Sequence, residues 1–213
     1  MSEAGFFRLN FRKVLVLAPH ADDAELGCGG TIAKLIEEGS EVILVAFSTP
    51  AGAPRHVLES EAHNARGVME IREENLLIYN YKVRTLPSHR QEILDRLYTL
   101  NIELKPDLVM LPSLSDLHQD HKTVAMEGLR AFKMRSILGY ELPWNHLSFN
   151  TAAFVPLEER HIENKIKASK AYISQMGRQF FDEEVLRGLA RTRGCQIGTQ
   201  YAEAFEVLRW IIK

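Results

Sequence analysis

Two short segments of this chain concentrate side chains that can bind a metal ion or transfer protons. The first is Pro19–Glu25 (PHADDAE), and the second is Ser115–His121 (SDLHQDH). Imidazole and carboxylate groups are common ligands of zinc and other divalent ions. A catalytic zinc ion uses three protein ligands, so the remaining groups could serve as a base for water and an acid for a leaving amine. The two segments together predict a metal-dependent hydrolytic site.

Each segment follows a predicted buried strand and precedes a predicted helix. The apolar runs Lys13–Ala18 and Asp107–Leu111 are typical of strands that are buried on both faces. The periodicity of Gly29–Glu38 and of His121–Lys133 predicts helices. Because the carboxyl ends of parallel strands meet at one edge of a sheet, we expect the two segments to lie close together there.

The remaining elements continue the same alternation. Helices are predicted at 57–71, His89–Leu100 and about 158–175, and further strands at Glu41–Phe47, Leu76–Tyr79, Ile137–Leu142 and Ser148–Pro156. Strands that alternate with helices indicate βαβ units and hence a mostly parallel sheet. The sequence therefore predicts an α/β fold, a three-layer αβα sandwich, in a single domain over residues 1–213.

A purely structural explanation exists for each polar segment alone. Asp22, Asp23 and Glu25 could favour a helix N-terminus through the helix dipole, and Asp120 could cap the helix that starts at His121. Two clusters of imidazole and carboxylate at the ends of parallel strands are much harder to explain in this way. We therefore favour the functional interpretation for the pair.

The glycine-rich turn raises a competing interpretation, dinucleotide binding. The run Gly27–Gly30 (GCGG) does not fit the G-x-G-x-x-G pattern. The second strand ends in Phe47-Ser48-Thr49, which offers no acid for a ribose hydroxyl. The glycines are better explained by close packing of the first helix.

Composition excludes several classes of partner. The net charge is −2 and the basic residues are scattered, so we expect no nucleic-acid partner. The longest apolar runs are too short to span a bilayer, so we expect no stable membrane insertion. The two cysteines lie far apart, and residues 1–12 lack the apolar core of a signal peptide. We expect a cytoplasmic protein.

The two motifs resemble those of a known family, the PIG-L/LmbE-like zinc deacetylases. The matching residues are Pro19–Glu25 followed by Gly29-Gly30, and later His118–His121 (HQDH), where the family has His-Pro-Asp-Asp with a Gly-Gly, and His-x-Asp-His. Weaker similarity continues at Glu61-Ala62, Lys167, Ser174-Gln175 and Tyr201–Phe205. Ala21 and Gln119 stand where proline is usual in the family.

The resemblance implies a Rossmann-like fold and a role for each polar residue. His20, Asp23 and His121 match the ligands of a Zn²⁺ ion, for which another divalent ion such as Fe²⁺ could substitute. The catalytic positions are Asp22, His118 and Asp120. Asp22 matches the general base, His118 matches the acid that also stabilises the oxyanion, and Asp120 matches the orienting partner of His118. The expected reaction removes acetate from an N-acetylated sugar or sugar conjugate.

The substrate and the assembly are less constrained. Arg55, in the loop Ser48–Arg55 after the second strand, could bind an anionic group of the substrate. Trp144 could stack on a sugar ring, and His146 could bond to one. Closed oligomers are common in the family, so the resemblance implies a homo-oligomer.

Two other functions stay open from the residues alone. A non-haem iron oxygenase also uses two histidines and one carboxylate, but generally on an antiparallel double-sheet barrel. A non-catalytic sugar-binding protein on the same fold would be expected to lose Asp22 or His118 first, and both are present.

Overall fold

The central feature of the computed structural model, which describes residues 9–49 and 53–212, is one seven-stranded sheet. The strand order is β3-β2-β1-β4-β5-β7-β6. The first five strands of that order are parallel: β3 (Leu76–Ile78), β2 (Glu41–Ser48), β1 (Lys13–His20), β4 (Leu108–Pro112) and β5 (Ser136–Tyr140). At the far edge, β7 (Tyr201–Arg209) runs antiparallel to both β5 and β6 (Ala153–Leu157).

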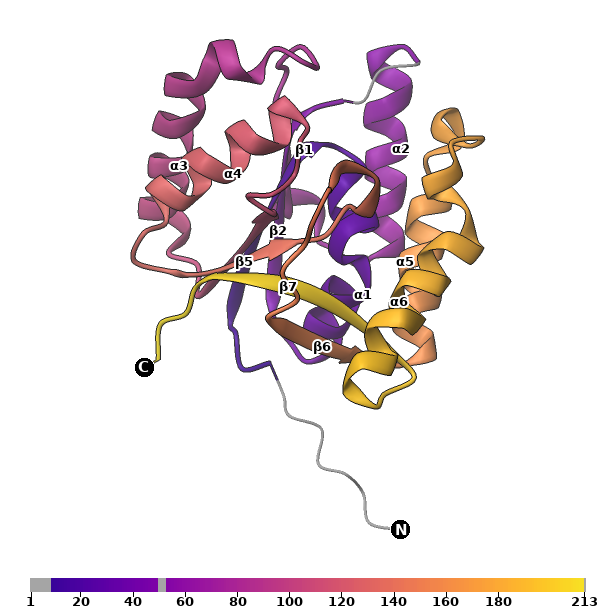
Figure 1. Cartoon of the computed structure of the whole chain (residues 1–213). Helices are drawn as coiled ribbons and strands as arrows, with labels where there is room; N and C mark the ends of the chain where they lie inside the picture. The colour runs from indigo at the N-terminus through magenta and orange to yellow at the C-terminus, as the bar shows by residue number, and fades with distance from the viewer. Residues whose placement is uncertain (1–8, 50–52, 213) are drawn as a thin grey trace.

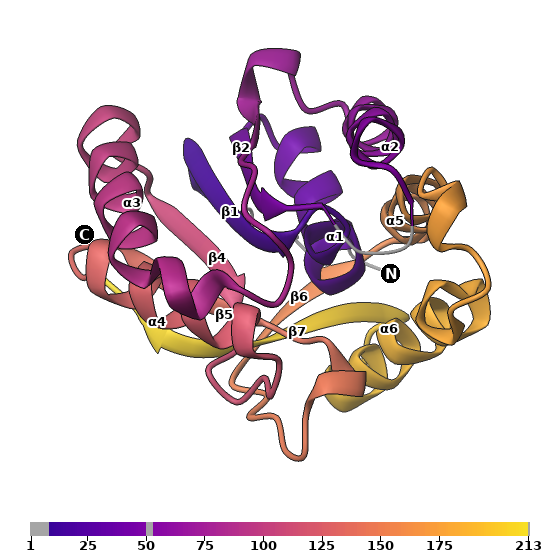
Figure 2. The same cartoon turned by 90° about the horizontal axis from the view of Figure 1, so that it is seen from above.

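Helices cover both faces of this sheet, as Figures 1 and 2 show. One face carries α3 (Arg90–Leu104) and α4 (Gln119–Ala131). The other carries four helices: α1 (Asp23–Glu37), α2 (Arg55–Val68), α5 (Glu159–Lys170) and α6 (Glu183–Ile197). The expected α/β fold, a three-layer sandwich with a mostly parallel sheet, is confirmed.

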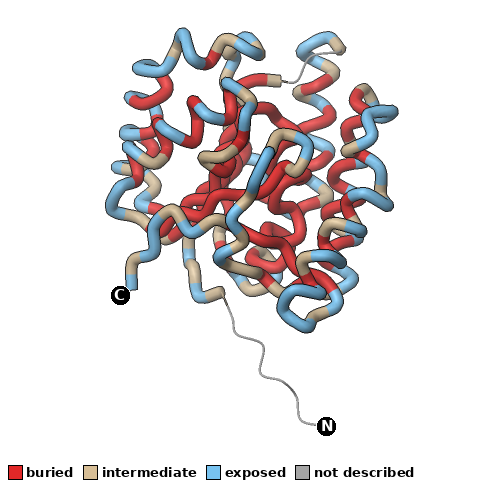
Figure 3. The backbone as a smooth tube through the Cα atoms, in the orientation of Figure 1, coloured by how far each residue is buried: buried red, intermediate tan, exposed pale blue. Residues whose placement is uncertain are grey.

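The buried strands explain why the sheet holds together between two helical layers. In β1, Val14 and Val16 face the core under α1, whereas Leu15 and Leu17 face the core under α3 and α4. All four side chains are fully buried. Successive side chains of a strand point to opposite faces, so a continuous apolar run fills both cores. The burial colouring in Figure 3 shows the strands as the most deeply buried part of the molecule.

The strand order places a crevice at the carboxyl ends of β1 and β4, where the two polar segments lie. The chain runs outward from β1 through β2 to β3, and then returns to β4 on the other side of β1. The crossovers from β1 and β4 therefore lead to opposite faces, which opens a crevice at their carboxyl ends. The segment after β1 carries His20, Asp22 and Asp23, and the segment after β4 carries His118 and His121.

Three features differ from the expectation. α1 begins at Asp23 rather than at Gly29 and contains a non-helical residue at Cys28 (φ −142°, ψ 25°), so the predicted helix corresponds to its second part. Neither α6 nor the antiparallel strand β7 was predicted.

No helix among the described residues has the length and apolar character needed to cross a membrane.

Candidate active site

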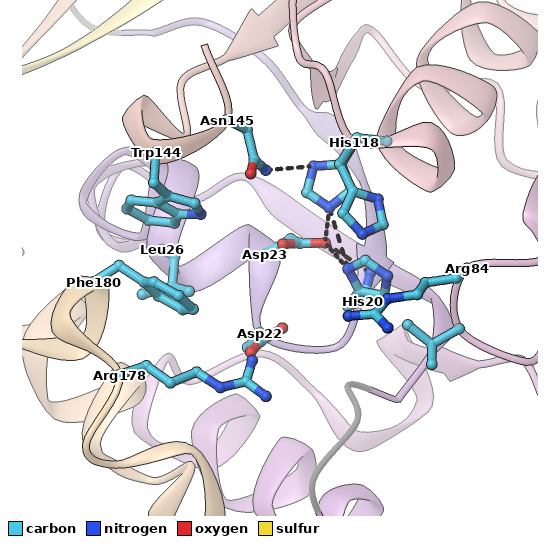
Figure 4. Close-up of a pocket in the computed structure, with 12 residues that line it drawn as sticks. His20, Asp22, Asp23, Leu26, Arg84, His118, Trp144, Asn145, Arg178 and Phe180 are labelled. Atoms are coloured by element: carbon cyan, nitrogen blue, oxygen red, sulfur yellow. Dashed lines mark hydrogen bonds and ion pairs between the residues drawn. The ribbon is translucent and has the colours of Figure 1, made fainter.

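Three ligand-type atoms form a compact triangle at the carboxyl ends of β1 and β4. His20 Nδ1 lies 3.1 Å from Asp23 Oδ2. His121 Nε2 lies 3.2 Å from both of these atoms. All three residues are buried, and Figure 4 shows the side chains of His20 and Asp23 pointing toward one another.

The triangle fits a metal ion. Tetrahedral zinc with bonds of about 2.0–2.1 Å places its ligand atoms roughly 3.3–3.4 Å apart. The observed separations are within about 0.3 Å of this spacing, so a small movement would open the triangle around an ion. A second combination, His20 with His118 and His121, also has ligand atoms within 4.8 Å of one another. The structure thus brings together the three predicted ligands and adds His118 beside them.

Two further carboxylates fix the orientation of the two buried imidazoles. His20 Nε2 contacts Asp120 Oδ2 at 3.1 Å, and His121 Nδ1 contacts Asp116 Oδ2 at 2.7 Å. A ring N–H that donates to a carboxylate leaves the other ring nitrogen with its lone pair toward the site. The nitrogen atoms in the triangle are therefore the ones free to bind a metal ion.

The electrostatics favour positive charge at the centre of the triangle. Burial opposes charge on His20 and His121, but attraction to Asp23 and hydrogen bonds to carboxylates outweigh it, so the pKa rises to about 9 for His20 and about 10 for His121. Burial alone would raise the pKa of Asp23, yet the same two histidines lower it. A divalent cation satisfies the same attraction, which is a second sign that the residues fit one.

Asp22 and His118 flank the triangle inside the same pocket. Burial and repulsion from Asp23 raise the pKa of Asp22 to about 6. Burial, followed by repulsion from His121 and His20, lowers the pKa of His118. His118 Nδ1 accepts from the backbone N–H of Asp120 at 3.1 Å, so the neutral ring carries its proton on Nε2.

Asp120 is the expected orienting partner of His118, and its backbone N–H donates to His118 Nδ1. Its carboxylate contacts His20 instead and accepts from the backbone N–H groups of Arg84 and Leu86. The contact with His118 is thus made by the backbone of Asp120. The physical reason is that His118 is the N-cap of α4, so its ring bonds back to the first turn.

Arg55 and His146 are placed away from the pocket. Arg55 is the first residue of α2, forms an ion pair with Glu59, and is not among the residues that line the pocket. The loop before it includes residues 50–52, which lie outside the described residues. Its role in substrate binding stays a prediction. His146 bonds to Ser115 and Leu142 and supports its own loop.

Of the pocket wall outside the two polar segments, the sequence analysis considered only Trp144. Trp144, which was considered for sugar stacking, lines the pocket and stacks on Phe180 with 4.6 Å between ring centroids. The wall also contains Leu26, Val83, Arg84, Asn145 and Arg178. Leu26 belongs to α1, whereas the other four residues come from three segments far apart in the sequence, so no local motif could have identified the wall as a whole. The cavity volume of about 230 Å³ is below the roughly 300–1,000 Å³ that encloses a drug-sized ligand. Only the reacting end of a larger substrate fits inside.

Comparison with known proteins gives a consistent family. The family profile described as PIG-L, GlcNAc-PI de-N-acetylase, matches residues 15–132, a span that contains both polar segments. The uncharacterized deacetylase YaiS of Escherichia coli K12 is 27% identical over 174 residues, which cover 78% of this chain and 93% of YaiS. Diacetylchitobiose deacetylase of Thermococcus kodakarensis is 24% identical, over 90% of this chain and 81% of that protein.

Solved structures share the fold at lower identity. N,N'-diacetylchitobiose deacetylase from Pyrococcus horikoshii superposes with a TM-score of 0.77 at 24% identity, over 93% of this chain and 84% of that one. GalB, the 4-carboxy-2-hydroxymuconate hydratase from Pseudomonas putida, superposes with a TM-score of 0.73 at 17% identity, over 95% and 98% of the two chains. Because one of these enzymes is a hydratase, the fold by itself does not select a reaction.

Proposed function

We propose a reaction for this chain from one premise: it belongs to the PIG-L family, whose profile is described as GlcNAc-PI de-N-acetylase. The proposed reaction is hydrolysis of the acetamide of an N-acetylated sugar or sugar conjugate, which releases acetate and a free amine. The proposed cofactor is a zinc ion bound by His20, Asp23 and His121. The observation that carries the proposal is the triangle of His20 Nδ1, Asp23 Oδ2 and His121 Nε2 with Asp22 and His118 beside it.

The protein groups around the triangle match the needs of amide hydrolysis. A bound zinc ion supplies Lewis acidity, which polarises a carbonyl group and lowers the pKa of water. We assign Asp22 as the base that accepts the proton of the attacking water. We assign His118, whose Nε2–H is available, as the donor that stabilises the oxyanion and then protonates the leaving nitrogen.

The pocket wall supports a sugar as the group that carries the acetamide. Trp144 is partly exposed and lines the pocket opposite the histidines in Figure 4. An aromatic ring at such a position offers a flat apolar surface for the face of a sugar ring. Both named relatives are deacetylases, and one acts on diacetylchitobiose, an N-acetylated sugar. Two observations disfavour the iron oxygenase alternative. This sheet is mostly parallel, whereas those oxygenases generally have an antiparallel double-sheet barrel, and the family profile is described as a de-N-acetylase.

The direct test is acetate release under controlled metal content. Metal-depleted protein is reconstituted with one equivalent of Zn²⁺ or of Fe²⁺ and incubated with N-acetylglucosamine, diacetylchitobiose and N-acetylglucosaminides. We expect equimolar acetate and free amine from at least one substrate, and no product after metal removal. Metal-loaded protein that releases no acetate from any of these amides contradicts the proposal.

A further inference from the structure

A buried hydroxyl group contacts the turn between the proposed ligand His20 and the proposed base Asp22. Tyr172 follows the C-terminal end of α5 and is fully buried. Its hydroxyl donates to the backbone carbonyl of Ala21 at 2.5 Å, and its oxygen lies 3.3 Å from Glu25 Oε1. Tyr172 is not among the residues that line the pocket. The hydroxyl therefore acts on the site through the turn that it holds.

This turn sets the direction of the Asp22 side chain. A peptide group is planar, so a fixed carbonyl at Ala21 also fixes the N–H of Asp22 in the same plane. The Asp22 carboxylate does not cap α1, and it has no hydrogen bond to another residue that the structure describes. The orientation of this carboxylate therefore depends on the backbone to which it is attached.

The proposed metal ligands, in contrast, have supports of their own. The backbone N–H of His20 donates to Asp23 Oδ2 at 2.8 Å, and His20 Nε2 contacts Asp120 Oδ2 at 3.1 Å. Asp23 and His20 thus hold each other, and a third carboxylate holds the imidazole ring. Loss of the Tyr172 hydroxyl should disturb Asp22 more than it disturbs the ligands.

The segment that carries Tyr172 is anchored to α2. The next residues form the 3₁₀ turn η4 (Ile173–Gln175). In this turn, the backbone N–H and the hydroxyl of Ser174 both donate to the buried carboxylate of Glu61, at 2.7 and 2.6 Å. Glu61 and Ser174 belong to the family resemblance, but the proposed reaction gives them no role. Two bonds from one residue to a buried carboxylate fix the segment that presents the Tyr172 ring.

We propose that Tyr172 is a positioning residue for Asp22. Its hydroxyl holds the Ala21 carbonyl, and the peptide plane then directs the Asp22 carboxylate into the pocket. The inference rests on the proposed function, because it concerns the base of that reaction. A misplacement of about 1 Å in an active site can cost roughly a hundredfold in rate, so the loss of such a support has a measurable effect.

The test removes one hydroxyl group from each of two buried tyrosines. Tyr172→Phe keeps the ring and loses the bond to Ala21. The matched control is Tyr140→Phe, because Tyr140 is also fully buried and its hydroxyl donates to the backbone carbonyl of Leu17 in β1 at 3.0 Å. Each variant leaves a buried carbonyl without this donor, so both should lower Tm by a similar amount, roughly 2–8 °C.

Only Tyr172→Phe should slow the reaction. With the N-acetylglucosaminides of the direct test, we expect its kcat to fall by roughly 10–100-fold and its KM to stay within about threefold of the wild type. Its affinity for zinc should also stay within about threefold, because the ligands keep their supports. Tyr140→Phe should keep kcat within about twofold of the wild type, because its bond lies in the strand and not in the turn.

A double-mutant cycle shows whether the effect passes through Asp22. In the Asp22→Asn background, Tyr172→Phe should lower kcat by no more than about twofold, because the group that it positions no longer acts as a base. An equal loss of kcat in both backgrounds overturns the inference, and so does a Tyr172→Phe variant with the kcat of the control. Loss of zinc affinity in Tyr172→Phe also overturns it, since the hydroxyl would then support the ligands.

Crystal structures of the zinc-loaded proteins separate this inference from the proposed function, because they need no turnover. In Tyr172→Phe, we expect the Asp22 carboxylate to move by about 1 Å or more, or to occupy two conformations, whereas Tyr140→Phe should keep the wild-type position. If no protein hydrolyses an amide but this displacement is found, the positioning role stands and the deacetylase proposal fails. An unchanged Asp22 carboxylate in Tyr172→Phe overturns the positioning role.

Discussion

At the scale of single residues, the fold gives two adjacent carboxylates, Asp22 and Asp23, different neighbours. Asp23 begins α1, and its Oδ2 lies within 3.2 Å of both histidine nitrogens. Asp22 is the N-cap of the same helix, and its carboxylate makes no contact with those nitrogens. It faces the pocket next to Arg178 (Figure 4). These different surroundings support the proposal that Asp23 binds the ion and that Asp22 acts on what the ion binds.

The first prediction separates these two roles. Asp22→Asn keeps the shape of the side chain but cannot accept a proton, so kcat should fall by at least roughly a hundredfold while metal stays bound. Asp23→Asn should instead weaken metal binding, and excess zinc should partly restore its activity. Steady-state kinetics and elemental analysis of both variants measure the difference. Zinc rescue of Asp22→Asn, but not of Asp23→Asn, would exchange the two assignments.

The second prediction concerns Asp116, to which the sequence analysis gave no role. Its Oδ2 contacts His121 Nδ1 at 2.7 Å, and its Oδ1 accepts from the backbone N–H of His118 at 2.8 Å. Asparagine has only one acceptor oxygen, so Asp116→Asn must lose one of these bonds. We expect a 10–100-fold loss of zinc affinity, typical of groups that orient a metal-binding histidine.

Competition with a fluorescent zinc chelator measures the affinity of Asp116→Asn. The matched control is Asp182→Asn, the same chemical change at the N-cap of α6, where asparagine caps as well as aspartate. The control should bind zinc like the wild type. Equal zinc affinity in Asp116→Asn and the control would show that Asp116 does not orient His121.

At the scale of elements, the irregular turn in α1 is stabilised by β7, a strand near the C-terminus. After Cys28 departs from helical geometry, the Glu203 carboxylate of β7 accepts from the backbone N–H groups of Gly30 and Thr31 at 3.0 and 2.7 Å. Lys165 of α5 donates to the same carboxylate at 2.6 Å. The buried charge of Glu203 is thus paired and hydrogen-bonded where the second part of α1 begins.

The third prediction tests the close packing of α6 against the residues that lead into β7. A Cβ atom on Gly194, near the end of α6, would lie 2.8 Å from backbone atoms of Thr199 and Gln200, which lead into β7. Backbone cannot move aside as a side chain can, so Gly194→Ala should lower the free energy of unfolding by about 1–3 kcal/mol.

Gly188→Ala is the matched control in the same helix, because no atom lies within 4 Å of its added Cβ. That variant should be more stable than the wild type by about 0.5–1 kcal/mol, through helix propensity. Urea unfolding of the three proteins gives the comparison. A Gly194→Ala variant at least as stable as Gly188→Ala would contradict the packing shown by the structure.

The elements that were predictable from sequence are those with a local signal. Buried parallel strands such as β1 and β4 are continuous apolar runs, and the candidate site lies at their carboxyl ends, so both the strands and the site could be predicted. β7 has no such run, because the buried Glu203 interrupts it. The start of α1 is hidden by Gly27, Gly29 and Gly30, which weaken any helical prediction. The pocket residues Arg84, Arg178 and Phe180 are adjacent only in the folded chain.

At the scale of the whole molecule, the site joins segments from most of the chain. The pocket residues run from His20 to Phe180, and Glu203 acts on α1 from β7. Binding at such a site draws together elements that are distant in sequence, so it should stabilise the fold as a unit. The homo-oligomer and the cytoplasmic location implied by the sequence stay predictions.

The last prediction follows from this coupling. A metal ion bound to the folded chain and not to the unfolded one adds about 2.7 kcal/mol of stability at a hundredfold excess over its dissociation constant. For a domain of this size, 1 kcal/mol corresponds to roughly 2–4 °C in Tm. Zinc added to metal-depleted protein at that excess should therefore raise Tm by about 5–11 °C in scanning calorimetry.

The variants decide whether this shift arises at the assigned site. Asp22→Asn should show the full zinc-dependent rise in Tm, since the triangle of ligand atoms is intact. Asp23→Asn should show little of it at the same zinc concentration, because the carboxylate charge that lies between His20 and His121 is absent. An equal rise in all three proteins would place the stabilising ion elsewhere, because an ion at this site cannot bind equally well without the Asp23 carboxylate.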